Sequence, residues 1–156
     1  MKYQLDDKNK QILEILQKDA KLSVKEIASR IQLSFTPTYE RIKNMEEAGI
    51  ISGYVALLNR NALGLKVVAY CNLSLKEQSK EAQMEFETAL REIPEVVEAV
   101  TLSGQYDYLI KIVVSDIESY NQFLVDVFST LPYIDHFQSN IMLSEIKSET
   151  AYRIPL

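Results

Sequence analysis

The chain of 156 residues contains no tryptophan, one cysteine, one histidine, and only four glycines and four prolines. A single cysteine, Cys71, excludes an intramolecular disulfide and any Cys-x-x-Cys motif. Because Cys71 lies in an apolar run from Val67 to Leu75, a buried hydrophobic role is favoured over a reactive thiol. The scarcity of cysteine and histidine speaks against a metal centre.

Signals of catalysis are also missing. There is no glycine-rich phosphate loop and no nucleophile-elbow motif. His136 stands alone in a strand-like run, which favours a structural role, and the adjacent acids Asp6-Asp7 and Glu46-Glu47 fit a helix cap and a solvated face better than a catalytic dyad. We therefore expect no catalytic residue, no metal ligand and no cofactor, and a protein that is not an enzyme.

No hydrophobic run approaches membrane-spanning length, and the first ten residues, MKYQLDDKNK, contain no apolar stretch like that of a signal peptide. These absences predict a cytoplasmic protein without a membrane partner. The composition, with 47% hydrophobic and 25% charged residues, is that of an ordinary globular protein.

The net charge of −5 is unevenly distributed. Residues 1–53 contain nine basic and eight acidic residues, whereas residues 54–156 contain eight and fourteen. The acidic residues 54–156 would repel phosphate, so a nucleic acid would bind to residues 1–53. The alternative is that the charges are unevenly distributed by chance.

Residues 23–49 predict two short helices joined by a tight turn. Ser23 and Glu26 have the spacing of a capping box, and Gly49 supplies a C-terminal stop. The turn falls at residues 32–34, and either Ser34 or Thr36 can cap the second helix. Two apolar faces follow from the spacing: Val24, Ile27, Ala28 and Ile31 in the first helix, and Thr38, Ile42 and Met45 in the second. The pattern is that of a helix-turn-helix.

An earlier helix completes a three-helix unit. Asp6 is its expected N-cap, its apolar stripe contains Leu5, Ile12, Leu13 and Leu16, and it ends near Asp19. In a helix-turn-helix, the start of the second helix meets base edges while its flanks meet phosphates. The candidate DNA contacts are Ser34, Thr36, Tyr39, Arg41 and Lys43. For Arg41 an intramolecular ion pair with Glu46 or Glu47 is the alternative.

After Gly49 the apolar residues alternate, which predicts a strand at residues 51–57, and residues 59–64 are rich in turn formers. From Lys66 the pattern strand, helix, strand occurs twice, with the two helix-ending prolines 38 residues apart at Pro94 and Pro132. Ser115 and Glu118 have the spacing of a second capping box. A doubled βαβ pattern predicts a ferredoxin-like fold with one bare sheet face, and such a face predicts a homodimer.

Between the two repeats lies the segment Ser103-Gly104-Gln105-Tyr106-Asp107-Tyr108. Gly104 and Gln105 suit a two-residue hairpin with a positive φ at the glycine. The turn is either purely structural or a site in which backbone N–H groups bind the carboxylate of an amino acid and Asp107 binds its ammonium group.

In its order of motifs the chain resembles the Lrp/AsnC (feast/famine) family of transcription regulators along nearly its whole length. The matching segments are Leu5-Asp6 with Ile12-Leu13, Ile27-Ala28, Leu33-Ser34, Glu40-Arg41-Ile42, the run from Glu46 to Ile51, the run from Gly104 to Leu109, and Ile146-Lys147. The chain departs from the family pattern at Gln32, Thr38 and Gln105. Gln32 replaces a glycine in a turn that requires left-handed geometry, at a cost of about 1 kcal/mol.

The resemblance implies an α+β protein with a winged helix-turn-helix domain at 1–53, a strand and linker at 54–64, and an ACT-like βαββαβ effector and oligomerisation domain at 65–156. It implies homodimers, assembled into octamers as tetramers of dimers, that bind promoter DNA and an amino-acid effector. By position, the effector-binding residues would be Ser103, Gly104, Tyr106, Asp107, Ser139 and Asn140. The expected function is a sequence-specific transcription regulator modulated by that effector. The alternative is an amino-acid-sensing module that acts on a protein partner.

Overall fold

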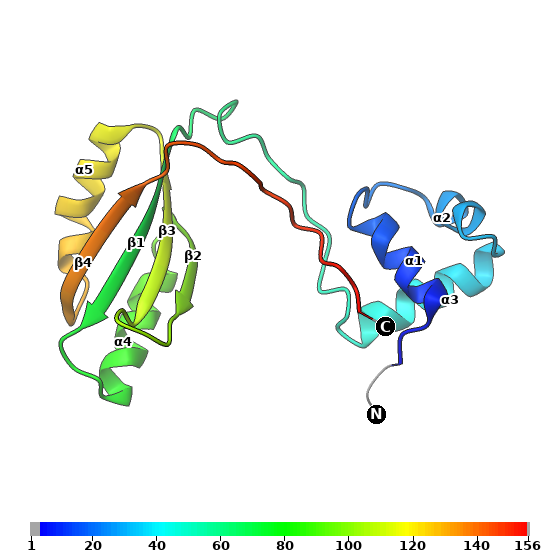
Figure 1. The fold of residues 1–156 in the computed structure, drawn as a ribbon, viewed down its shortest axis with the longest axis horizontal. Helices are drawn as coiled ribbons and strands as arrows, with labels where there is room; N and C mark the ends of the chain where they lie inside the picture. The colour runs from blue at the N-terminus through cyan, green and yellow to red at the C-terminus, as the bar shows by residue number, and fades with distance from the viewer. Residues whose placement is uncertain (1–3, 156) are drawn as a thin grey trace. The chain divides into compact units, whose positions relative to one another are not determined.

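The computed structural model describes residues 4–155, and the chain forms two compact units (Figure 1). The first unit contains the described residues up to Leu57 together with the segment that begins at Lys147, and the second is Leu58–Ile146. The predicted second domain, 65–156, included the segment that begins at Lys147, whose described residues lie with the first unit by compactness. The outer limits of the predicted domains, residues 1 and 156, lie outside the described residues. No helix within residues 4–155 is long and apolar enough to cross a membrane.

The first unit has three helices: α1 (Asp7–Leu16), α2 (Val24–Arg30) and α3 (Phe35–Glu47). The predicted caps are confirmed at two of them. The Asp6 side chain accepts the N–H of Asn9, and Ser23 forms the full capping box with Glu26. Gln32 has a φ of 56°, which is the left-handed geometry expected in the turn between α2 and α3, and Gly49 ends α3 with a φ of 70°.

The core of this unit is formed by the predicted apolar stripes. Ile12, Ile27 and Met45 are almost completely buried where the three helices meet. Thr38 is also fully buried, and its hydroxyl donates to the carbonyl oxygen of Ser34 at 2.9 Å. The inward orientation of Thr38, Ile42 and Met45 is confirmed, and α3 is held on the hydrophobic core along its length.

The strand predicted at residues 51–57 is wrong. The structure has no ladder of hydrogen bonds over these residues, and Val55 is 83% exposed. A strand requires a second strand to pair with its backbone groups. Within the described chain no such partner exists for this segment, so its alternating sequence forms an extended connection between the two units.

The second unit is a four-stranded antiparallel sheet with two helices. In chain order its elements are β1 (Val67–Leu75), α4 (Lys80–Arg91), β2 (Val96–Thr101), β3 (Tyr108–Val114), α5 (Ile117–Asp126), a 3-10 turn (Phe128–Thr130) and β4 (Ile134–Ile141). The strand order is β2-β3-β1-β4, so the two βαβ repeats interleave (Figure 1). The predicted ferredoxin-like α+β fold is confirmed.

Both helices cover the same sheet face. Phe86 of α4 and Phe123 of α5 pack with Cys71, Ile110 and other buried residues of β1 and β3 in one hydrophobic core. The opposite, uncovered face is mixed rather than apolar. From β1 and β3 it presents Tyr70 and Lys111, whose ammonium group lies 5.7 Å from the centre of the Tyr70 ring.

Two details of the second repeat differ from expectation. The N-cap of α5 is Asp116, whose carboxylate accepts the N–H of Ser119, so the predicted capping box of Ser115 with Glu118 is wrong. A carboxylate is the stronger acceptor for an N-terminal N–H, and Asp116 directly follows Ser115. The last strand also ends at Ile141 instead of continuing to Ile146.

Candidate DNA-reading surface and effector site

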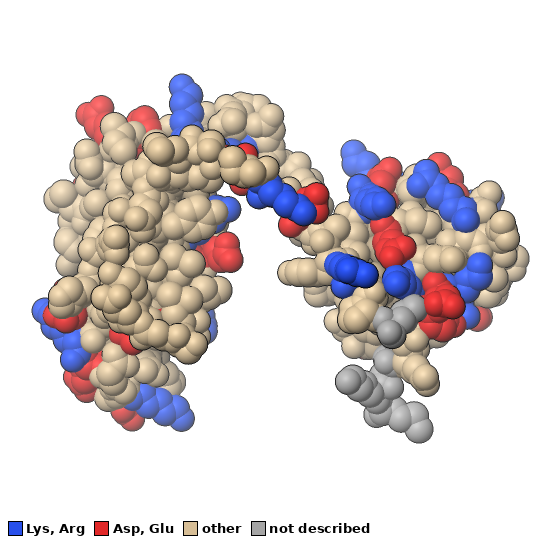
Figure 2. Space-filling model, in the orientation of Figure 1, with Lys and Arg blue, Asp and Glu red and all other residues tan. Residues whose placement is uncertain are grey.

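Several polar side chains at the start and on the outer side of α3 are exposed to solvent. Ser34 is the N-cap, yet its side chain makes no capping hydrogen bond, and Thr36 is exposed. Tyr39 is 49% exposed, and the Lys43 side chain is 56% exposed, with its ammonium group 3.6 Å from the Glu47 carboxylate. Figure 2 shows basic and acidic side chains interspersed on the visible face of this unit. The start and outer side of α3 are therefore open to a ligand.

Arg41 differs from the other candidate DNA contacts. Its Nη1 donates to Asp6 at 2.7 Å and to the side-chain oxygen of Asn9 at 2.8 Å, and both residues lie at the start of α1. The intramolecular alternative for Arg41 thus exists, but with Asp6 as the partner instead of Glu46 or Glu47. The backbone N–H of Asn9 and, to a smaller extent, the Arg41 guanidinium hold the pKa of Asp6 below its ordinary value. Arg41 fastens α3 to α1.

Sequence reasoning missed Phe35, the first residue of α3. Its ring is 48% exposed and lies parallel to the ring of Tyr39, with 6.1 Å between the ring centres. The signal that could have identified it is an aromatic residue with no place in the buried stripe of Thr38, Ile42 and Met45.

In the second unit, the loop between β2 and β3 is longer than predicted. Leu102 donates its N–H to the carbonyl oxygen of Asp107 at 2.8 Å, so four residues, Ser103 to Tyr106, form the turn. Gly104 does not have a positive φ. The two-residue hairpin is therefore wrong. Within residues 4–155 no N–H group of this four-residue loop donates a hydrogen bond, and Ser103 and Gly104 are exposed.

Asp107 ties this loop to the end of β1. Its Oδ2 accepts the backbone N–H of Leu75 at 2.8 Å and the side-chain amide of Gln78 at 2.9 Å, while its own N–H donates to Leu73 at 2.8 Å. Both side-chain bonds end on Oδ2. Asp107 is half-buried, so its carboxylate orders the loop and still has an edge open to solvent.

The predicted effector residues on β4 lie on opposite faces of the sheet. Asn140 is on the uncovered face and donates to the carbonyl oxygen of Tyr70 at 3.3 Å. Ser139 lies on the helix-covered side, where it hydrogen-bonds the buried Tyr120 of α5. The Tyr106 hydroxyl donates to Gln138 at 2.7 Å, which joins the loop to the uncovered face. The structure brings Tyr106 toward β4 through Gln138, a residue that sequence reasoning missed.

Ser139 and Tyr120 form a polar cluster with Cys71, the only cysteine. Cys71 is completely buried, and its sulfur lies 3.4 Å from the Tyr120 hydroxyl. Burial raises the pKa of the Cys71 thiol. A buried thiol with a raised pKa is a poor nucleophile, which agrees with the structural role expected from the sequence.

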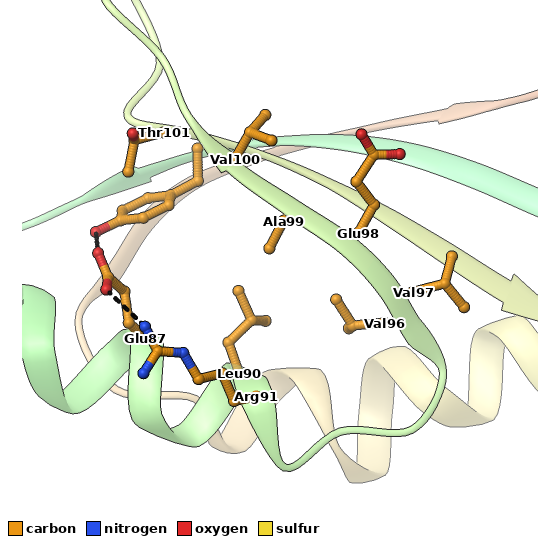
Figure 3. Close-up of a pocket in the computed structure, with 10 residues that line it drawn as sticks. Glu87, Leu90, Arg91, Val96, Val97, Glu98, Ala99, Val100 and Thr101 are labelled. Carbon is orange, nitrogen blue, oxygen red and sulfur yellow. Dashed lines mark hydrogen bonds and ion pairs between the residues drawn. The ribbon is translucent and has the colours of Figure 1, made fainter. Parts of the chain in front are cut away.

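A separate cavity of about 610 Å³ lies between α4 and the edge strand β2 (Figure 3). Glu87 lies at one end of it, where it accepts a hydrogen bond from the Tyr108 hydroxyl at 3.2 Å and lies 3.6 Å from Arg91. Burial, followed by the Glu87 charge, raises the pKa of Tyr108 to about 12. None of the predicted effector residues lines this cavity.

Comparison with known proteins also divides the chain into two domains, although the second match runs beyond Ile146 into the segment that lies with the first unit. Residues 68–152 match the family model described as the Lrp/AsnC ligand binding domain, and residues 5–52 match that of a winged helix-turn-helix DNA-binding domain. The chain belongs to the Lrp/AsnC family. It is a DNA-binding transcription regulator with a ligand-binding domain, and nothing in the comparisons favours a module that acts on a protein partner instead.

Known transcription regulators match this protein over almost the full chain. The proline dehydrogenase transcriptional activator of Rhizobium radiobacter is 35% identical over 92% of each chain. The leucine-responsive regulatory protein of Escherichia coli K12 is 33% identical over 92% of this chain and 87% of its own. A transcriptional regulator of Neisseria meningitidis, solved as its L-Met complex, has a TM-score of 0.92 at 31% identity and covers 96% of this chain and 97% of its own.

Proposed function

We propose that this regulator responds to a free amino acid, which binds at the loop Ser103 to Asp107 and alters binding to promoter DNA. The observation that carries the proposal is that, within residues 4–155, this loop has unpaired backbone N–H groups next to an acidic residue. Its N–H groups are free of hydrogen bonds within the described residues, and Asp107, whose carboxylate binds Leu75 and Gln78, follows the loop directly in sequence. A free amino acid has a carboxylate for such N–H groups and an ammonium group for such an acid.

The remaining members of the proposed effector site differ in their roles. Ser103 and Gly104 offer backbone donors, Tyr106 offers the edge of its ring, and Asn140 lies on the same sheet face as the Tyr106 partner Gln138. Ser139 lies on the helix-covered face, where its hydrogen bond to Tyr120 positions β4 from the side opposite to Asn140. The L-Met complex of the Neisseria meningitidis regulator supports an amino acid as the effector class.

The proposed DNA contacts are at the start and outer side of α3. Thr36 and Tyr39 face the groove, Lys43 reaches a phosphate, and Ser34 aligns a phosphate with the first N–H groups of the helix. Arg41 contributes to DNA binding mainly by holding α3 on α1 through Asp6. The protein acts as a regulator in the cytoplasm and has no catalytic role.

We further propose that the functional form is a homodimer that assembles into an octamer. Large apolar side chains are exposed on both segments that connect the two units. Val55, Leu57 and Leu58 lie on one of them, and Leu143 and Ile146, 97% and 92% exposed, lie on the other. Exposed apolar residues in this number are uncommon on monomers, and a second copy of the chain would cover them.

A thermal-stability screen of the full-length protein against the twenty amino acids tests the proposal. An amino acid at a hundredfold its dissociation constant stabilises the folded protein by about 2.7 kcal/mol. We expect a concentration-dependent rise of the unfolding temperature with one amino acid or a few of similar chemistry. The absence of a rise with all twenty, in a sample shown by sizing to be oligomeric, would contradict the effector proposal.

A further inference from the structure

Helix α3 carries two aromatic rings that lie outside the hydrophobic core of the first unit. Phe35 and Tyr39 are 48% and 49% exposed, four residues apart on one side of α3, with ring planes within 8° of each other. Neither ring belongs to the hydrophobic core of the first unit. Within residues 4–155 the Tyr39 hydroxyl has no hydrogen-bond partner. A phenylalanine that stays 48% exposed gains only about half of the free energy available from burying its ring, so the exposed part of the pair is apolar surface that a ligand can cover.

The position of the pair on α3 identifies the ligand. Phe35 is the first helical residue, and the first turn of a recognition helix is the part that meets base edges in the major groove. Lys43 continues the row one turn beyond Tyr39, with its side chain 56% exposed. The row therefore runs from the helix N-terminus, which favours anions, through two rings, to a cation. The phosphates on the two sides of a DNA groove could bind the two ends of this row, the N-terminus of α3 and Lys43.

The chemistry of the rings identifies the feature that is read. Phenylalanine has no donor or acceptor for the polar edges of bases. In the major groove the apolar feature of a base pair is the C5-methyl group of thymine, which aliphatic and aromatic side chains contact. Stacking on Tyr39 restricts the Phe35 ring, so less side-chain freedom is lost when DNA binds.

We propose that Phe35, held in place by Tyr39, reads thymine C5-methyl groups in the major groove of double-stranded DNA. This inference rests on the use of α3 as the reading helix. A self-contact, in which the rings pack on a second copy of the chain, is the competing use. The row from Phe35 through Tyr39 to Lys43 favours DNA because phosphate suits both of its ends: the N-terminus of α3, and Lys43, whose exposed ammonium group lies 3.6 Å from Glu47.

The experiment removes the methyl group and nothing else. A duplex selected from a random pool by the full-length protein is synthesised with thymine, and again with deoxyuridine at each thymine in turn. Base pairing and all polar groups of the groove are retained. We expect deoxyuridine at one or more positions to weaken binding about fourfold for each methyl group that is no longer buried.

The protein variants link this penalty to the ring. Phe35→Ala should bind thymine and deoxyuridine duplexes equally, whereas Val125→Ala, which removes an exposed apolar side chain of α5, should keep the full penalty. Thermal unfolding and sizing test first whether both variants are folded and assembled. The proposal is overturned if the unaltered protein is indifferent to deoxyuridine at every position, a result that needs no variant, or if Phe35→Ala keeps the penalty.

Three outcomes distinguish a failure of this inference from a failure of the DNA-binding function. If Phe35→Ala reduces the oligomeric mass in the absence of DNA, the rings form a self-contact and the proposal is wrong. If the unaltered protein selects no sequence and binds no duplex at low salt, DNA binding by α3 itself fails. Tight binding that does not depend on the methyl groups leaves DNA binding intact and rejects only the reading role of Phe35.

Discussion

Gln17 and Tyr152 exchange two hydrogen bonds across 135 residues of sequence. The Gln17 side-chain amide donates to the Tyr152 carbonyl oxygen at 3.2 Å, and its own oxygen accepts the Tyr152 N–H at 2.6 Å. Ile154, two residues further, packs against the core of the first unit. The C-terminal segment is thus an extended strap that completes the helical unit, in which its end lies beside the helices (Figure 1).

Removing this strap should destabilise the helical unit. For a chain ending at Ile146 we expect a loss of about 1 kcal/mol or more, because two hydrogen bonds of about 0.5–1.5 kcal/mol each and the Ile154 contact disappear. Hydrogen exchange of the α1 and α3 amides measures the loss. Gln17→Ala should reproduce part of it, whereas Tyr152→Ala should not, since both bonds use the Tyr152 backbone. Unchanged protection in the truncated chain would show that the strap is dispensable.

The charged Asp6 carboxylate, which accepts the N–H of Asn9 and pairs with Arg41, should make the stability of the first unit depend on pH. Asp6 has a pKa below its ordinary value of 3.8, chiefly through the N–H of Asn9, so its charged form stabilises the fold. This contribution is present above pH 3.8 and is lost as the pH falls through the lower folded pKa. Asp6→Asn, which can still cap α1, should cost about 0.2–1 kcal/mol near pH 7. Asp6→Ala should cost about 1 kcal/mol more.

Urea unfolding at a series of pH values checks this contribution. The difference between the unaltered protein and Asp6→Asn should shrink toward zero as the pH falls below 3.8. Asp7→Asn is the matched control, because Asp7 is the adjacent acid in the first turn of α1. A difference that does not change with pH would mean that the charge of Asp6 does not contribute to stability.

The turn between α2 and α3 can be tested at Gln32, whose φ is 56°. A glycine has no Cβ to clash in this geometry, so Gln32→Gly should raise the free energy of unfolding by up to about 1 kcal/mol, reduced by the greater freedom of the unfolded chain. Gln32→Val should lower it by about 1 kcal/mol or more, since branched residues avoid positive φ. Thermal unfolding that ranks valine equal to glycine would place the strain elsewhere.

The proposed recognition of the effector ammonium group can be separated from the ordering of the loop. Asp107→Asn keeps an acceptor for the Leu75 N–H but removes the charge, whereas Gln78→Ala removes one tether and keeps the charge. Hydrogen bonds to charged groups contribute about 1.5–3 kcal/mol, so Asp107→Asn should weaken effector affinity by about tenfold or more. Gln78→Ala should change it much less. Equal losses in calorimetric titrations of both variants would assign Asp107 a structural role.

Local patterns in the sequence were sufficient for most of the fold. The capping box of Ser23 with Glu26 and the buried stripe of Thr38, Ile42 and Met45 depend on residues three to seven positions apart, so they can be recognised without a structure. The doubled βαβ pattern predicted the sheet for the same reason. The spacing of apolar residues predicts a helix or strand reliably when the segment against which it packs is close to it in the sequence.

The predictions that proved wrong concern features whose structure depends on residues far away in the sequence. Residues 51–57 alternate as a strand does, but alternation cannot show whether a partner strand exists. The partner of Arg41 is Asp6, 35 residues away, and the strap reaches Gln17 across the whole chain. The loop at Gly104 is longer than predicted because Asp107 is bound to Leu73 and Leu75 of a neighbouring strand. None of these contacts produces a pattern of residue spacing that can be recognised in the sequence.

The central claim is that an amino acid bound in the second unit changes DNA binding by the first. The most direct measurement is the affinity of the full-length protein for the DNA upstream of its own gene, over a series of salt concentrations, with and without the amino acid that stabilises the protein. We predict that the logarithm of affinity falls linearly with the logarithm of salt concentration, and that the amino acid shifts the affinity at every salt concentration. By reciprocity, DNA should shift the affinity for the amino acid by the same factor. Absence of binding at low salt, or identical affinities with and without the amino acid, would contradict the claim.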